Sequence, residues 1–390
     1  MKKICFLMPT VFNLGGEQRV VSCLSSILSK NGYEVTLLLF NNRYKEDYSI
    51  YNLDKNVSVK YVDNYFTFFH KLSRKVRNLN SKYGFFKYFR FLQILFFKWS
   101  FPYHDVKKEL KKINPDVIVG VSGDYAMLCS LLKKELNLKT IGWQHSCHDA
   151  YFNMKGNRHF NEKKAFNFLI KNGIDQYIVL TKTDKEKFEK EFSISPIQIY
   201  NMKSFTTNQR ANLKAKQIIA AGRLVSLKGF DLLIEAFNLF QVKCPDWTLK
   251  IVGEGEEKEN LNKLIEKLNL SDKVILTGYC NDMQKMYCES SIYVLSSKWE
   301  GFPMVLTECM EVGLPMISFD IDVMKEFIAN GIDGILVPKF DVNKLASSLE
   351  NLASDFELRS KISKNCLKKI EMLSENNILD EWKKVLEELN

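Results

Sequence analysis

Short apolar runs alternate with helical patterns along the whole chain of 390 residues, and this alternation restricts the fold more than any other feature. Near the start, the apolar run Lys3–Pro9 is followed by a turn containing Gly15-Gly16. A helical pattern from about Glu17 to Lys30 then leads to a second apolar run, Val35–Phe40. Strand, helix and strand in this order are the repeating unit of parallel sheets covered by helices. We therefore predict an α/β fold.

The alternation loosens once, around Ser193–Asn208, where a proline and a polar Thr-Thr-Asn-Gln stretch occur. We place the domain boundary there and predict two doubly wound, Rossmann-like domains, residues 1–200 and 201–373, followed by a helical segment over 374–390. Open parallel sheets bind ligands where their strands end, so two facing domains would form a cleft for a ligand. The further predicted strands are Asp116–Gly120, Thr140–Trp143, Tyr177–Leu180, Gln217–Ala221, Thr248–Val252, Val274–Thr277, Ile292–Leu295, Pro315–Phe319 and Ile335–Val337. A capping box, Thr183-x-x-Glu186, is expected to open the helix that leads to Phe192.

Cysteine usage and hydropathy exclude several classes of protein. The nine cysteines fall singly, with no C-x-x-C pair, which argues against a zinc ribbon or a disulfide framework and suits a reducing cytoplasm. No apolar run approaches the roughly 20 residues of a membrane-spanning helix, and the N-terminus lacks the pattern of a signal peptide. We expect a cytoplasmic chain unless a surface retains it.

The net charge of +10 is unevenly distributed. Residues 1–200 carry 32 Lys and Arg against 18 Asp and Glu, whereas residues 201–390 carry 24 against 28. All of the excess positive charge therefore lies in the N-terminal half, which indicates an anionic partner for that half.

Residues 64–104 do not fit a plain α/β domain. They contain 8 Lys and Arg, 15 aromatic residues and no Asp or Glu, and the cations Lys87, Arg90 and Lys98 alternate with aromatic rings. This composition favours a segment at an anionic membrane surface. One alternative is a domain helix whose aromatics form core. Another is a single-stranded nucleic-acid site, which we do not expect because no RNA-binding motif occurs.

The most specific motif runs from Ser296 to Glu308, after the predicted strand Ile292–Leu295. Proline is favoured at a helix start, so the backbone around residues 303–305 is expected to offer N–H groups to an anion. Glu300 precedes this turn and Glu308 lies along the helix, where they would reach a sugar and a ribose. Alternatively, both are solvated surface carboxylates. The turn and the helix start consist of Gly301, Phe302, Pro303, Met304 and Val305.

Two further loops follow predicted strands. In the stretch from Gly222 to Gly229, Arg223 offers a planar fork of donors and Lys228 a compact charge, which together suit two linked phosphates. They are otherwise surface cations. Gly15 and Gly16 would let the backbone approach a phosphate or a sugar closely, although a Gly-Gly pair is often only a turn.

The stretch Trp143–Asp149 contains His145 and His148, two of the five histidines. Zinc requires three or four ligands, and the spacing provides no further partner, so we expect no metal site. His145 placed against a reacting sugar and His145 as a structural residue both remain open.

In combination, these elements resemble the retaining glycosyltransferases of family 4, which have the GT-B architecture of two facing Rossmann-like domains. The resemblance is strongest from about Gln217 to Val337. In two places the chain departs from it: Gln18 stands where many members have Glu, and Ile321–Met324 replaces a loop containing Pro and Gly. The motifs that carry it are Gly222-Arg223…Lys228-Gly229, Glu300-x7-Glu308, Gly313-Leu314-Pro315 leading to Gly331…Gly334, and Gly15-Gly16…Arg19-Val20-Val21.

The resemblance implies roles for individual residues. Arg223 and Lys228 would bind the donor diphosphate, and Glu308 the ribose. Glu300 and the backbone of Phe302–Met304 would meet the donor sugar, which Gly16 would approach from the opposite domain. The family's histidine near that sugar corresponds best to His145, with His148 close by. The last helix would cross back to the N-terminal domain.

We therefore expect a hexose or N-acetylhexosamine to be moved from a nucleotide sugar, by default a UDP-sugar, to a lipid-linked saccharide or surface polysaccharide at the inner membrane face. Retention would give an α-linked product. No metal or other cofactor is expected, because Arg223, Lys228 and the helix start can carry the charge of the leaving group. The alternatives are a sugar-nucleotide 2-epimerase of the same architecture and a non-catalytic nucleotide-sugar-binding protein.

Overall fold

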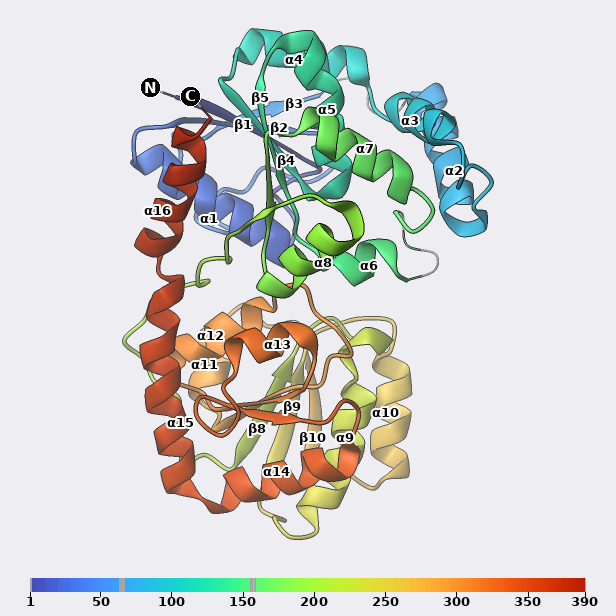
Figure 1. The fold of residues 1–390 in the computed structure, drawn as a ribbon. Coiled ribbons are helices and arrows are strands. Elements are labelled where there is room, and N and C mark those ends of the chain that lie inside the picture. The colour runs from blue at the N-terminus through green and yellow to red at the C-terminus, as the bar shows by residue number, and fades with distance from the viewer. Residues whose placement is uncertain (1, 63–66, 155–156, 158, 390) are drawn as a thin grey trace. The chain divides into compact units, whose positions relative to one another are not determined.

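The computed structural model describes residues 2–62, 67–154, 157 and 159–389. The chain divides into two compact units: one contains the residues up to Asn201 and those from Glu375 onward, and the other contains Met202–Ser374. The sequence pattern places the boundary at residue 200. Each unit is a parallel sheet covered by helices (Figure 1). The predicted class of two doubly wound α/β domains is therefore confirmed.

The first unit contains a seven-stranded sheet in the order β3-β2-β1-β4-β5-β6-β7, with all paired strands parallel. Its strands are β1 (Lys3–Met8), β2 (Glu34–Leu39), β3 (Ser58–Tyr61), β4 (Val117–Val121), β5 (Lys139–Trp143), β6 (Gln176–Val179) and β7 (Ile197–Gln198). Its helices are α1 (Gly16–Lys30), α2 (Phe68–Tyr83), α3 (Arg90–Trp99), α4 (Tyr103–Ile113), α5 (Ser122–Leu136), α6 (His148–Phe152), α7 (Lys163–Gly173), α8 (Lys182–Phe192) and α16 (Glu375–Glu387).

Side chains alternate between the two faces of this sheet, and each face has its own helices. Leu7 and Leu38 belong to the core that includes residues of α5, α7 and α8. Phe6 lies in ring contact with Trp143, which in turn packs edge-on against Trp382 of α16 with centroids 4.8 Å apart. Trp382 is 1% exposed. This aromatic contact explains why the last helix belongs to the first unit.

The second unit contains a six-stranded parallel sheet in the order β10-β9-β8-β11-β12-β13. Its strands are β8 (Gln217–Ala221), β9 (Thr248–Val252), β10 (Val274–Gly278), β11 (Ile292–Leu295), β12 (Met316–Phe319) and β13 (Ile335–Val337). Its α-helices are α9 (Phe230–Gln241), α10 (Lys258–Lys267), α11 (Met283–Cys288), α12 (Met304–Val312), α13 (Asp322–Phe327), α14 (Val342–Ser354) and α15 (Phe356–Lys369). Short 3₁₀ turns occur at Ser226–Lys228 and Ile370–Leu373.

In both sheets the strand order reverses next to the first strand of the unit. The reversal lies between β1 and β4 in the first unit and between β8 and β11 in the second. The crevice at the carboxyl ends of the two strands at such a point is where open α/β sheets bind ligands. The loops that follow these four strands are therefore the first places to search for function.

One local prediction is wrong, and two further local features were not predicted. The capping-box prediction at Thr183 is wrong: α8 is capped by Thr181, whose Oγ1 accepts from the Asp184 N–H at 3.0 Å. Sequence periodicity did not indicate β3 and β7. The aromatic segment forms two helices, α2 and α3, separated at Gly84, which adopts the left-handed conformation that ends α2.

Among the helices of the described residues, none has the length and apolar character needed to cross a bilayer.

Candidate functional site

The loops after β8 and β11 are joined by direct hydrogen bonds. Ser296 Oγ donates to the carbonyl of Lys228 at 2.8 Å, and the Lys298 N–H donates to the carbonyl of Leu227 at 2.9 Å. Between them Gly229 has φ 61°, and a Cβ there would lie 2.3 Å from the Ser296 carbonyl oxygen. Only glycine allows this approach. The two loops at the strand-order reversal therefore form one fixed structure.

This fixed structure brings together Lys228 and Glu300, which the sequence places 72 residues apart. Lys228 Nζ lies 2.6 Å from Glu300 Oε1, and the two side chains are 20% and 12% exposed. An ion pair with so little solvent contact is screened less than a surface pair. The alternative of a solvated loop carboxylate is therefore wrong for Glu300. A ligand phosphate would compete with Glu300 for this lysine.

Arg223 lies in the loop directly after β8, and its side chain is exposed. Among the described residues its guanidinium group has no hydrogen-bond or ion-pair partner. Its backbone is fixed nevertheless, because the neighbouring Gly222 N–H donates to the Val252 carbonyl at 2.9 Å. Gly253 passes so close that a Cβ on it would lie 1.9 Å from the Gly222 carbonyl oxygen. The loop thus offers a guanidinium group without an internal counterion.

Glu308 lies on α12 and is buried, with 5% exposure. Its Oε2 accepts a hydrogen bond from the hydroxyl of Tyr287, on α11, at 2.7 Å. Burial and the charge of Glu308 raise the pKa of Tyr287, so the hydroxyl remains protonated and donates. The alternative of a surface carboxylate is therefore wrong for Glu308, whose position is fixed by a buried tyrosine.

The helix that follows β11 begins at Met304, one residue later than the predicted start at Pro303. Pro303 is the N-cap residue and Met304 the first helical residue of α12. Proline carries no N–H, so the donors at this helix start belong to Met304 and Val305 rather than to all of residues 303–305. Phe302 packs edge-on against Phe327 with centroids 5.1 Å apart, which holds the turn at Gly301.

Gly15 and Gly16 lie in the first unit, at the carboxyl end of β1 and the start of α1. The Gly15 N–H donates to the hydroxyl of Tyr51 at 2.7 Å, and the guanidinium of Arg19 lies 5.5 Å from the same ring. Gly16 is exposed. The structure therefore places the predicted donor-binding residues in both units, each set at the strand-order reversal of its own sheet.

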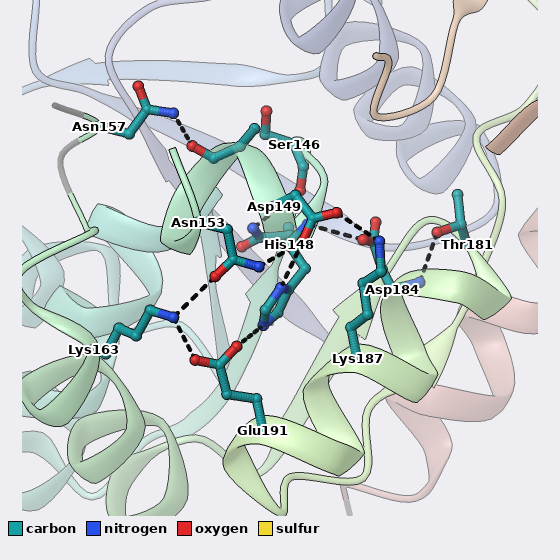
Figure 2. A network of polar contacts seen from close by, with 12 residues as sticks. Ser146, His148, Asp149, Asn153, Asn157, Lys163, Thr181, Asp184, Lys187 and Glu191 are labelled. Atoms are coloured by element: carbon teal, nitrogen blue, oxygen red, sulfur yellow. Dashed lines mark hydrogen bonds and ion pairs between the residues drawn. The ribbon is translucent and has the colours of Figure 1, made fainter. Parts of the chain in front are cut away.

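His148 is part of a structural network that joins α6, α7 and α8 (Figure 2). Its ring Nε2 lies 3.0 Å from the carboxylate of Glu191, and its backbone N–H donates to Asp184 at 2.8 Å. Lys163 lies 2.5 Å from the same Glu191 carboxylate. The ring is 2% exposed and packs among phenylalanines. These contacts make His148 a structural residue.

His145 differs from His148 in having no carboxylate within ion-pair distance among the described residues. Its Nε2 is buried and has no hydrogen-bond partner among the described residues, and its ring packs against Trp143 with centroids 4.2 Å apart. Burial lowers the pKa of His145 to about 3, so the imidazole is neutral at physiological pH. His145 can therefore offer a hydrogen bond but no positive charge. Its position against a donor sugar stays a prediction.

Within the described ranges, no group of three or more His, Cys, Asp and Glu side chains is arranged to hold a metal ion.

Comparison with known proteins extends these findings. Residues 203–369, most of the second unit, match the family model "Glycosyl transferases group 1". An uncharacterized glycosyltransferase of Haemophilus influenzae is 29% identical, with 99% of this chain and 100% of that protein covered. The amylovoran biosynthesis glycosyltransferase AmsD of Erwinia amylovora is 26% identical over the same shares.

The comparisons support a GT-B glycosyltransferase. Among solved structures, a mutant of S. aureus TarM in complex with fondaparinux, α-GlcNAc-glycerol and UDP has a TM-score of 0.76 at 19% identity, with 98% of this chain and 99% of that chain covered. At this identity the likeness concerns the fold, which is the GT-B arrangement of two parallel-sheet domains. The relatives named above are glycosyltransferases, so the epimerase and the non-catalytic binding protein are not favoured.

Proposed function

We propose that the chain is a retaining glycosyltransferase that moves a sugar from a UDP-sugar to a saccharide acceptor of a cell-surface polymer. One observation carries this proposal: Arg223, Lys228, Glu300 and the start of α12 gather at the strand-order reversal of the second unit. Glu308 lies further along the same helix. This is the set that a nucleotide diphosphate requires, with cations and N–H donors for the phosphates and carboxylates for hydroxyl groups.

The chemistry of the leaving group explains the need for this set. When the bond between the anomeric carbon and the diphosphate oxygen breaks, negative charge develops on the diphosphate. Arg223, Lys228 and the N–H groups at the start of α12 would stabilise that charge. Donors already aimed at the developing charge are typically the largest catalytic contribution, with about 3 kcal/mol for one donor.

The proposal includes retention of configuration at the anomeric carbon. We propose that the acceptor oxygen attacks the anomeric carbon from the face that the diphosphate leaves. The departing phosphate oxygen takes the acceptor's proton, so that an α-linked donor gives an α-linked product. Glu300 is not assigned as a nucleophile, because its carboxylate is held by Lys228. The complex of TarM with α-GlcNAc-glycerol and UDP supports this choice of linkage and nucleotide, and the amylovoran relative supports a surface polysaccharide as product.

Independence from metal ions belongs to the same proposal, because the cations of the site can carry the charge of the leaving group. A thermal-shift screen of nucleotide sugars in the presence of EDTA tests donor class and metal requirement together. We expect stabilisation by UDP-sugars with EDTA present. Stabilisation that requires an added divalent ion would overturn the metal-independent site. Interconversion of the donor without any acceptor would indicate the epimerase instead.

Replacing Glu300 by Gln is expected to lower kcat about 100-fold while UDP affinity stays within about threefold. The amide keeps the shape but removes the charge that pairs with Lys228, so the lysine remains available for the diphosphate. Initial rates and isothermal titration with UDP measure the two effects separately. Glu350→Gln, which breaks the surface pair of Glu350 with Lys243 at 2.8 Å, is the matched control. Equal losses of kcat and UDP affinity would contradict a role toward the donor sugar.

We further propose that α2, α3 and the turn between them meet an anionic membrane at its inner face, as the sequence composition indicates. Helices α2 and α3 lie side by side in the first unit (Figure 1). Most of the large apolar rings here face solvent, which is unusual for so many neighbouring residues, although Phe97 of α3 belongs to the core of the first unit. The most exposed of them are Phe68, Phe85, Tyr88 and Phe91, at 81%, 64%, 72% and 74%.

The cations of this surface are not equivalent. Lys87 and Arg90 are exposed, and they lie over the rings of Tyr88 and Phe168 at 5.8 and 4.1 Å. Lys98 instead lies 4.2 Å from the ring of Tyr103 and 3.6 Å from the carboxylate of Glu135. Lys87 and Arg90 are therefore the better placed of the three predicted residues to contact anionic lipid.

The double variant Lys87→Gln/Arg90→Gln is expected to bind vesicles of anionic phospholipid about 10-fold more weakly, since each cation near such a surface contributes about 1 kcal/mol. Vesicle co-sedimentation at low and high salt measures this loss. Lys263→Gln/Lys267→Gln, at exposed lysines of α10, is the control and should change little. Equal binding by the wild type and both double variants would reject the surface.

A further inference from the structure

The first unit contains a pocket with a volume of about 370 Å³ that is separate from the residues assigned to the donor. Its lining includes Pro9, which follows β1, and Asp124 and Tyr125, which lie at the start of α5 directly after β4. Strands β1 and β4 are the pair at which the strand order of the first sheet reverses. The pocket therefore occupies the ligand-binding position of its own sheet.

The floor of this pocket is a buried charged cluster centred on Arg77. Arg77 is 5% exposed; it donates to Glu162 through Nε and Nη2 at 3.1 and 2.8 Å, to Asp124 through Nη2 at 3.0 Å, and to Ser100 through Nη1 at 3.2 Å. A guanidinium group carries five N–H donors. The fifth, on Nη1, has no acceptor among the described residues. The cluster thus holds Arg77 in place and leaves one of its N–H groups available to a ligand.

Two more arginines, Arg43 and Arg74, line the same pocket, and Asp124 is the acidic residue of the lining. Arg77 is already paired with Asp124 and with Glu162, which is not part of the lining, so three guanidinium groups meet two carboxylates and one net positive charge remains. Guanidinium groups bind phosphate and carboxylate in a bidentate manner, more specifically than lysine does. The lining therefore favours a ligand that carries one of these anions.

A wall of three aromatic rings completes the pocket. The ring of Phe40 lies 4.9 Å from Tyr125 and 5.9 Å from Phe101, and Phe101 lies 5.7 Å from Tyr125. All three residues line the pocket and are buried. Pockets with such a wall and a few convergent polar groups bind small organic ligands. The three rings meet edge to face, at interplanar angles of 66–87°, and such apolar rings beside arginines suit a sugar that bears an anionic group.

We propose that this pocket binds the anionic group, phosphate or carboxylate, of an acidic saccharide acceptor. The inference rests on the proposed function, because it names the acceptor class of that reaction. An anionic ligand agrees in sign with the excess of positive charge in residues 1–200. The acceptor is then an acidic saccharide, with either sugar phosphate or uronic acid in its chain.

Titration of the full chain with glucose 6-phosphate, glucuronate and glucose, without nucleotide, tests the proposal. We expect the charged probes to bind, the preferred one identifying the anion, and glucose to bind at least 10-fold more weakly. The double variant Arg43→Gln/Arg74→Gln should lose at least 10-fold in affinity for the charged probe. Lys75→Gln, at an exposed lysine of α2 outside the pocket, is the control.

Glucose bound as tightly as the charged probes, or unchanged affinity in the double variant, would overturn the proposal. If the double variant fails to fold, the single variant Arg43→Gln, at an exposed side chain, gives the same test. UDP binding by the same proteins separates the two hypotheses. If the charged probe binds and the arginine variants weaken it, but UDP does not bind, only the proposed function is refuted. If UDP binds but the charged probes do not, only the proposed ligand of the pocket is refuted.

Discussion

Replacing Lys228 by alanine is expected to lower kcat about 10²- to 10³-fold, the loss measured when one preorganised donor is removed from developing charge. Lys228 is assigned to the diphosphate and is held 2.6 Å from Glu300. The variant loses the cation and leaves the Glu300 carboxylate without its counterion. The hydrogen bonds that join the two loops use the Lys228 backbone, so they persist in the variant. The fold is therefore expected to remain.

Initial rates at saturating donor, together with a melting curve, measure this effect. Lys263→Ala, at an exposed lysine of α10, is the matched control and should keep wild-type kcat. Lys228→Arg keeps the charge but changes the shape of the donor group, so it should recover only part of the rate. Wild-type turnover in Lys228→Ala would show that this lysine does not stabilise the leaving group.

Replacing Arg77 by alanine is expected to destabilise the first unit by about 3–5 kcal/mol, the cost of breaking a buried ion pair from one side. Glu162 and Asp124 have side chains that are 2% and 11% exposed, and each is paired with Arg77 at 3.0 Å or less. Without the guanidinium, the two carboxylates remain close together with little solvent. At about 2–4 °C per kcal/mol for a unit of this size, Tm should fall by about 10 °C.

The pH dependence of this loss has a definite sign. Burial alone would raise the pKa of Glu162, but the charge and hydrogen bonds of Arg77, together with those of His159, outweigh burial, and the pKa lies below its ordinary value. In the wild type, Glu162 therefore stabilises the fold above its unfolded pKa, and this contribution is lost as pH falls through the folded pKa. In Arg77→Ala, burial acts without the cation, so the variant should recover stability as pH falls from 8 toward 5.

Calorimetry of both proteins at several pH values checks this sign. Lys75→Ala, on the exposed side of α2, should leave Tm within about 1 °C, as expected for a surface substitution. A Tm deficit that grows on acidification would mean that Arg77 does not hold Glu162 ionised.

Local sequence patterns sufficed for much of the fold because they depend on residues close in the chain. Strands β8, β9, β11 and β13 have the predicted bounds, and the boundary between the units lies within a residue or two of the predicted one. The predicted cap of α8 is wrong because Thr181 and Thr183 are each followed, three positions later, by an acidic residue. Only the hydrogen bond from the Asp184 N–H distinguishes the two threonines.

Contacts between distant residues could not be predicted in this way. Arg77 lies in a basic and aromatic segment whose composition is typical of an exposed surface. Its carboxylate partners, however, are 47 and 85 residues away in the sequence, and they hold its side chain in the pocket of the first unit. Tyr287 likewise gives no local signal that its hydroxyl fixes Glu308. Neither contact can be predicted from the residues that neighbour Arg77 or Tyr287 in the sequence, because both contacts depend on how separate helices pack.

Isothermal titration of UDP into the protein in the presence of EDTA tests the central claim most directly. The claim is that Arg223, Lys228 and the start of α12 in the second unit hold a nucleotide diphosphate. We predict saturable binding that weakens about 10- to 100-fold in both Arg223→Ala and Lys228→Ala, since hydrogen bonds to charged groups contribute about 1.5–3 kcal/mol. Lys263→Ala should bind as the wild type does. Equal UDP affinity in all four proteins, or no binding by the wild type, would contradict the account.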